Sequence, residues 1–179
     1  MRQRVYKLAD TYASIIGFRT KITDARDYGS IIRDLGNMCG QVSLQAVNAD
    51  FIYGVEHAIE VLKITLEAKR RNIMIAKKAE TDLLLRLLYT TQISVALRSG
   101  GLKNNNYGCF ILFSTNKSQL LTVRKNIGKL FEVKNEVLTA NKKKREIISG
   151  ILGLPVNKTM SDDKPFTKYL SERACLITK

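Results

Sequence analysis

The stretch Tyr107-Gly108-Cys109-Phe110-Ile111-Leu112-Phe113 is a nearly continuous apolar run in a chain of 179 residues. Its short length and its aromatic and β-branched residues favour a strand over a helix. A strand without a polar face is typical of the middle of a sheet, because both of its surfaces are covered there. We therefore expect residues 107–113 to form the central strand of the fold.

Two earlier segments are expected to join this strand in a sheet. Residues 14–22 are rich in β-branched and aromatic side chains, and residues 41–47 alternate between polar and apolar. Residues 174–177 end the chain with a further short apolar run, which we interpret as a strand. Residues 1–11 are polar and without periodicity, so we expect them to form a flexible N-terminal arm.

Helical periodicity fills the intervals between the strands. Residues 53–71 carry apolar side chains on two opposite faces, which predicts a helix in the middle of the fold. Further helices are expected over 25–35, 76–89, 92–98, 117–130, 142–150 and 166–171. Neither a repeat nor a linker interrupts the pattern, so we expect residues 12–179 to form a single α/β (α+β) domain. Its small mixed or antiparallel sheet would be packed with several helices.

The charge of the chain points to a polyanionic partner. Lys and Arg number 30 against 16 Asp and Glu, which gives a formal net charge of +14. Such an excess favours nucleic acid first and an anionic membrane surface second. No apolar run approaches the ~20 residues of a membrane span. We therefore expect a cytoplasmic chain without a membrane segment. We also interpret the three cysteines, Cys39, Cys109 and Cys175, as reduced core residues.

The side chains of the common catalytic sites are missing from this sequence. His57 is its single histidine, so neither a Ser/His/Asp triad nor a multi-histidine metal site can be assembled. The sequence also contains no Gly-rich phosphate loop of the Gly-x-x-x-x-Gly-Lys-Ser/Thr type. We expect no catalytic residues, no metal, no small-molecule cofactor and no enzymatic activity.

Two groups of basic residues are candidates for contact with RNA. Around the helix at 76–89, Lys78 and Arg86 offer phosphate contacts and Tyr89 offers a ring for stacking a base, although this line is equally consistent with an exposed charge ladder. The run Lys142-Lys143-Lys144-Arg145 can bind phosphate or can be a solvated helix face.

Several segments together resemble one known family. Gln45-Ala46-Val47-Asn48-Ala49-Asp50-Phe51-Ile52-Tyr53-Gly54-Val55-Glu56-His57-Ala58 resembles the strand-to-helix signature of the Cgi-type subunit of the KEOPS complex, whose eukaryotic counterpart is the PRPK-binding protein. Further similar pieces follow in the family's order: Glu80-Thr81-Asp82-Leu83-Leu84-Leu85-Arg86, Thr91-Gln92-Ile93-Ser94-Val95-Ala96-Leu97, Gly100-Gly101-Leu102-Lys103 and Leu170-Ser171-Glu172-Arg173-Ala174-Cys175-Leu176-Ile177. The resemblance spans about residues 16–179. Thr91 stands where the family usually has Arg, and the N-terminal arm is longer than in the family.

The resemblance implies a non-enzymatic subunit of the complex that installs threonylcarbamoyl on the adenosine next to the anticodon of tRNA. It implies binding to the Bud-type kinase/ATPase subunit and, as in archaeal-type complexes, capture of tRNA through its single-stranded 3′ CCA end. The candidate RNA-binding residues are Lys78, Arg86, Gln92, Arg98, His57 and Gly54. The alternative is a purely structural kinase-binding adaptor without RNA contact.

Overall fold

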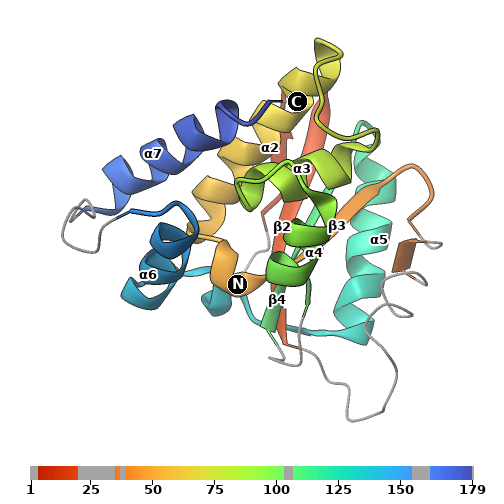
Figure 1. The fold of residues 1–179 in the computed structure, drawn as a ribbon. Coiled ribbons are helices and arrows are strands. Elements are labelled where there is room, and N and C mark those ends of the chain that lie inside the picture. The colour runs from red at the N-terminus through yellow and green to blue at the C-terminus, as the bar shows by residue number, and fades with distance from the viewer. Residues whose placement is uncertain (1–3, 20–34, 37–38, 103–106, 155–161, 179) are drawn as a thin grey trace.

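Strand β4, Tyr107–Ser114, lies inside an antiparallel sheet, as the apolar run predicts (Figure 1). The computed structural model describes residues 4–19, 35–36, 39–102, 107–154 and 162–178. In that part of the chain β4 pairs with β2, Thr11–Arg19, on one side and with β3, Ser43–Asn48, on the other. The strand order is β1-β2-β4-β3, with β1 at Tyr6–Leu8, and β5, Glu132–Val133, pairs with the end of β2.

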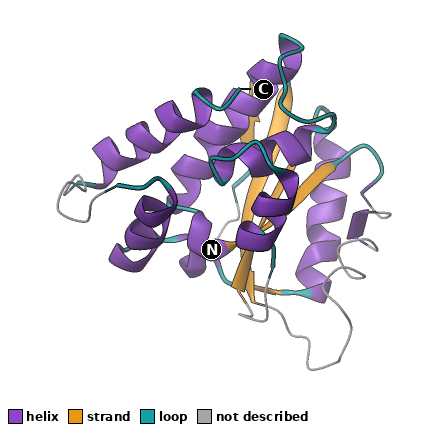
Figure 2. Cartoon of the chain, in the orientation of Figure 1, coloured by secondary structure: helices purple, strands orange, loops and turns teal. Residues whose placement is uncertain are grey.

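Helices lie around these strands (Figure 2), and most of them follow one another along the chain without a strand between them. They are α2 (Gly54–Arg70), α3 (Ala79–Leu87), α4 (Ile93–Gly100), α5 (Lys117–Leu130), α6 (Lys142–Ile151) and α7 (Asp163–Cys175), with short 3₁₀ helices η1 (Ala49–Phe51) and η2 (Asn135–Leu138). The fold is therefore a single α+β domain, as expected from the sequence. The predicted helix at 25–35 falls almost wholly outside the described residues.

Helices cover the sheet on both faces, which explains why β4 has no polar side. Cys109, Ile111 and Phe113 pack into the cluster formed with α2 and α3. Phe110 and Leu112 point the other way, into the cluster formed with α5. In Figure 1, α5 lies on one side of the strands, while α2 and α7 lie on the other. Helix α2 packs on β2 and is itself covered by α3 and α7, which accounts for its two apolar faces.

One glycine in β4 is required by a close contact across the sheet. A side chain at Gly108 would collide with the ring of Phe18 on the neighbouring strand. That ring stacks on Phe110, with 4.1 Å between the ring centroids. The glycine therefore leaves room for an aromatic pair that fills the α5 side of the core.

The prediction of a strand at 174–177 is wrong. Helix α7 continues to Cys175, and a turn follows it. Phe166, Leu170 and Ala174 recur every four residues and are all buried, so the apolar end of the chain belongs to a helical face. Cys39 and Cys109 are buried as expected, whereas the expectation that Cys175 is a core residue is wrong. Cys175 follows Ala174 on α7, lies off the buried face and is exposed.

The expectation of a flexible arm over residues 1–11 fails at its C-terminal part. Tyr6–Leu8 pair with β2 as an edge strand, with Tyr6 opposite Ala13 and Leu8 opposite Thr11. Tyr6 and Leu8 also pack against the core on the α2 side. Three residues are too short for an alternating pattern to be recognised in the sequence, and the pairing with β2 is what stabilises them.

Candidate nucleic-acid interface

The segment between β3 and α2, which carries the longest part of the family resemblance, is fixed by local hydrogen bonds. The side-chain oxygen of Asn48 accepts from the backbone N–H of Asp50 at 2.9 Å and so caps η1. Gly54 has a φ of +88°, a region that favours glycine. At this turn the backbone N–H of Tyr53 donates to Nδ1 of His57 at 3.2 Å. Gly54 therefore has a conformational role at the start of α2.

His57 is fully buried and uncharged. Because its Nδ1 accepts a hydrogen bond, the ring proton is on Nε2, which lies 3.1 Å from the hydroxyl oxygen of Tyr89 and donates to it. Burial lowers the pKa of His57 to about 3, and the nearby charge of Lys144 acts in the same direction. The prediction that His57 contacts RNA is therefore not supported by its position: it joins α2 to the end of α3.

Tyr89 is the partner of His57 and is not a free stacking ring. Its backbone has a φ of +52° directly after the last turn of α3, and its side chain is partly buried. Burial, followed by the proximity of Tyr169, raises the pKa of its hydroxyl above the ordinary value. A base that stacked on this ring would have to compete with the packing around it.

Arg86 is buried in an ion pair and does not form part of the basic surface. Its Nε donates to Oδ2 of Asp82 at 2.7 Å, and both side chains are almost fully enclosed. Its Nη1 donates to the carbonyl oxygens of Ala174 at 2.9 Å and Ile177 at 3.2 Å. The prediction that Arg86 is a surface phosphate contact is corrected accordingly: the side chain connects α3 to the end of α7.

The basic run at the start of α6 divides into two exposed and two enclosed side chains. Lys142 and Lys143 are exposed, with Lys143 paired to Asp50 at 3.3 Å, whereas Lys144 is buried. The ammonium of Lys144 donates to the carbonyl oxygens of Ile52 at 2.9 Å and Val137 at 2.5 Å. Burial lowers the pKa of this group to about 8. The sequence suggested either a phosphate-binding run or a solvated helix face. Neither interpretation included a lysine that connects three segments of the chain.

Arg145, the last residue of the run, lies in a polar cluster between α6, α2 and α7. Its Nη2 is 2.6 Å from both the hydroxyl oxygen of Tyr53 and Oδ1 of Asp163, and its guanidinium lies over the rings of Tyr53 and Phe166. Tyr53 also hydrogen-bonds to Asp163, and that bond is the first cause of the lowered pKa of this carboxyl. The cap that Asn141 places on α6 gives no sequence signal for this division, because the exposed and the enclosed basic residues follow the same cap.

Lys144→Met is expected to lower the free energy of unfolding by about 2 kcal/mol, because two buried carbonyl oxygens lose a charged donor. Lys142→Met, at a side chain that is 91% exposed, is the matched control and is expected to change stability by less than about 0.5 kcal/mol. Urea unfolding of both variants measures the difference. Equal stabilities would show that the Lys144 hydrogen bonds contribute nothing.

Lys78, Gln92 and Arg98 are the candidate residues that the structure places on the surface. Lys78 precedes α3, while Gln92 and Arg98 lie at the two ends of α4. Across the described part of the chain, none of their side chains forms a hydrogen bond or an ion pair. Ile93 and Leu97 of the same helix are 48% and 57% exposed. Helix α4 thus presents apolar side chains next to an amide and a guanidinium, a combination that sequence patterning did not reveal.

No protein-family model matches this sequence, and no curated protein matches it significantly. Over the described residues there is no group of three or more His, Cys, Asp or Glu side chains that could hold a metal ion. In the same part of the chain, none of the helices combines the length and the apolar content needed to cross a lipid bilayer. The assignment of function therefore depends on the resemblance and on the surface just described.

Proposed function

We propose that this chain is a non-catalytic subunit of a KEOPS-type complex for threonylcarbamoyladenosine modification of tRNA. In this role it binds the Bud-type kinase/ATPase subunit and recruits tRNA through its 3′ CCA end. The ordered resemblance over about residues 16–179 supports the family assignment. An α+β fold is compatible with it, and the segments that carry the resemblance pack together, since β3 leads into α2, α2 contacts α3 and α7, and α3 contacts α4.

The observation that carries the RNA part of the proposal is the exposed surface of α4. Single-stranded RNA ends present unstacked bases, which bind to flat or apolar side chains, and phosphates, which bind to Arg and Lys. Ile93 and Leu97 offer the apolar contacts, Gln92 an amide for base edges, and Arg98 a guanidinium for phosphate. These groups lie on one short helix, so a few nucleotides can contact all of them.

Arg98→Glu is expected to weaken tRNA binding about tenfold, because a phosphate contact is replaced by a repulsive charge. The slope of log affinity against log salt concentration should fall by about 1. Lys129→Glu is the matched control, because Lys129 is also an exposed basic residue in the last turn of a helix, on α5 across the sheet. Fluorescence anisotropy with labelled tRNA at several salt concentrations measures both variants.

The 3′-end contact is tested with the wild-type chain and a tRNA that lacks its terminal CCA. The proposal predicts clearly weaker binding of the truncated tRNA and little further loss when Arg98→Glu is combined with it, because both changes remove the same contact. Equal affinity of the two tRNAs would rule out capture through the 3′ end.

The exposed apolar side chains of α4 also favour a second candidate function, a kinase-binding adaptor without RNA contact. Exposed apolar side chains that lie together commonly mark a protein interface. Leu97→Asp distinguishes the two candidates when the chain is co-purified with a Bud-type kinase. Loss of the kinase together with negligible tRNA affinity of the wild-type chain would support the adaptor. Retained kinase binding and lost tRNA binding would support RNA recruitment.

A further inference from the structure

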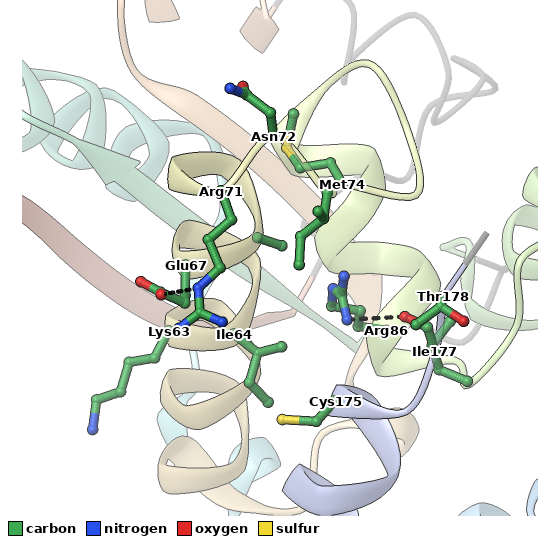
Figure 3. Close-up of a pocket in the computed structure, with 12 residues that line it drawn as sticks. Lys63, Ile64, Glu67, Arg71, Asn72, Met74, Arg86, Cys175, Ile177 and Thr178 are labelled. Carbon is green, nitrogen blue, oxygen red and sulfur yellow. Dashed lines mark hydrogen bonds and ion pairs between the residues drawn. The ribbon is translucent and has the colours of Figure 1, made fainter.

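A cavity of about 730 Å³ lies between the C-terminal half of α2, the segment after it and the end of α7 (Figure 3). Its volume is within the range of about 300–1,000 Å³ that is common for small-molecule sites. None of the residues of α4 lines it, so it is separate from the proposed RNA surface. It therefore requires an explanation of its own.

Much of the wall of this cavity is apolar. Ile64 and Ala68 contribute from α2, Met74 from the segment that follows, and Ile177 from the residues after α7. Figure 3 shows Ile64 on α2, Ile177 across from it and Met74 above both. Burial of apolar ligand atoms against such a wall is favourable by about 25 cal/mol per Å². A ligand of this cavity is expected to have an apolar body.

Arg86 supplies a buried cationic donor to the same cavity. Its side chain is only 4% exposed and lines the cavity. Of its five N–H groups, the one on Nε binds Asp82, and those on Nη1 bind the carbonyl oxygens of Ala174 and Ile177. The two N–H groups of Nη2 have no hydrogen-bond partner among the residues that the structure describes. An oxygen of an anion is the natural acceptor for them.

Cations outnumber carboxylates among the residues that line the cavity. Lys63, Arg71 and Arg86 lie in the lining with the single carboxylate of Glu67. Lys63 also pairs with Glu60 and Arg86 with Asp82, so the donors left for a ligand are those of Nη2 on Arg86. Glu67 is already engaged, with its Oε1 at 2.5 Å from Nε of Arg71 and at 2.7 Å from Nη2 of Arg70. In Figure 3 the guanidinium of Arg71 lies along α2 beside Ile64, close to the apolar wall, while Lys63 points outward.

We infer that this cavity binds a small carboxylate whose apolar body lies against Ile64 and Met74 and whose carboxylate accepts hydrogen bonds from Nη2 of Arg86. The ligand class follows from the juxtaposition of an apolar wall with a buried guanidinium that has unused donors. The inference does not depend on the proposed function, and a failure of either leaves the other intact.

The test uses 1-naphthoate as the probe and 1-naphthamide as its neutral counterpart. Titration of the ¹⁵N-labelled full chain with naphthoate is expected to give saturable shifts at residues around the cavity, with a Kd on the order of 1 mM or tighter for a ligand of this size. Naphthamide is expected to bind about tenfold more weakly, since it cannot form the charged contact. Equal binding of the acid and the amide would overturn the inference.

Two pairs of variants locate the site without altering Arg86, which is part of a buried ion pair with Asp82. Cys175→Trp places a bulky ring at an exposed position in the lining and is expected to reduce naphthoate binding at least about tenfold, whereas Leu176→Trp, exposed and outside the lining, is the control. Arg71→Glu is expected to weaken binding about tenfold and Arg70→Glu about twofold, because Arg70 pairs with the same Glu67 but does not line the cavity. Unchanged binding in Cys175→Trp, or equal losses within the arginine pair, would place the ligand elsewhere.

Discussion

Replacing Arg86 with methionine is expected to lower the free energy of unfolding by about 3–5 kcal/mol, as is usual when one partner of a buried ion pair is removed. Asp82 is completely buried and would lose its guanidinium partner. The carbonyl oxygens of Ala174 and Ile177 would also lose their donor. The end of α7 would then lose its polar connection to α3. Urea unfolding monitored by circular dichroism measures the change.

Two further variants separate this explanation from a general effect of removing positive charge. Arg98→Met removes an exposed guanidinium and is expected to change stability by less than about 0.5 kcal/mol. Asp82→Asn combined with Arg86→Met is expected to recover part of the loss, because the unpaired buried charge is gone, while the amide oxygen can still accept from the backbone N–H of Ile75. If Arg86→Met were no more destabilising than Arg98→Met, Arg86 would not be a structural residue.

Arg86 also shows which part of this molecule is readable from sequence and which is not. An acidic and a basic residue four positions apart on a helix are a common pattern for an exposed ion pair, and Asp82 and Arg86 fit it. What buries this pair is the end of α7, whose carbonyl oxygens come from residues 88 and 91 positions away along the chain. A contact between residues so far apart in the sequence is determined by the tertiary fold, and the local spacing of residues does not predict it.

The elements that were predicted correctly depend on residues close together in the sequence, so their pattern can be recognised there. The apolar run of β4 has two buried faces, and its sequence shows this directly. The helix expected at 53–71 is observed at Gly54–Arg70, since its buried positions repeat with helical spacing. The prediction of a strand at residues 174–177 was wrong because four positions are too few to distinguish a strand from the last turn of a helix. Periodicity therefore predicts long elements well and their short ends poorly.

The wild-type chain is expected to lose stability as the pH is lowered from about 6.5 to 5, and His57 is expected to account for a large part of the loss. Burial lowers the pKa of His57 to about 3 in the folded chain, whereas the unfolded chain titrates near the ordinary value of 6.5. Below pH 6.5 the unfolded state therefore takes up a proton that the folded state excludes. The stabilisation from the neutral ring is fully present above pH 6.5 and is lost toward pH 3, by up to about 1.4 kcal/mol for each pH unit.

His57→Asn isolates this contribution, because its side-chain oxygen can still accept the backbone N–H of Tyr53 in place of Nδ1. The variant loses the hydrogen bond to Tyr89, so its stability at pH 7 is expected to be lower by about 1–2 kcal/mol. The decisive quantity is the slope between pH 6.5 and 5, which should be shallower than in the wild-type chain by about 1 kcal/mol for each pH unit. Carboxylates titrate mainly below this pH window, and they affect the wild-type and variant chains alike. Equal slopes for the two chains would therefore mean that His57 becomes protonated without unfolding the region around Tyr53 and Tyr89.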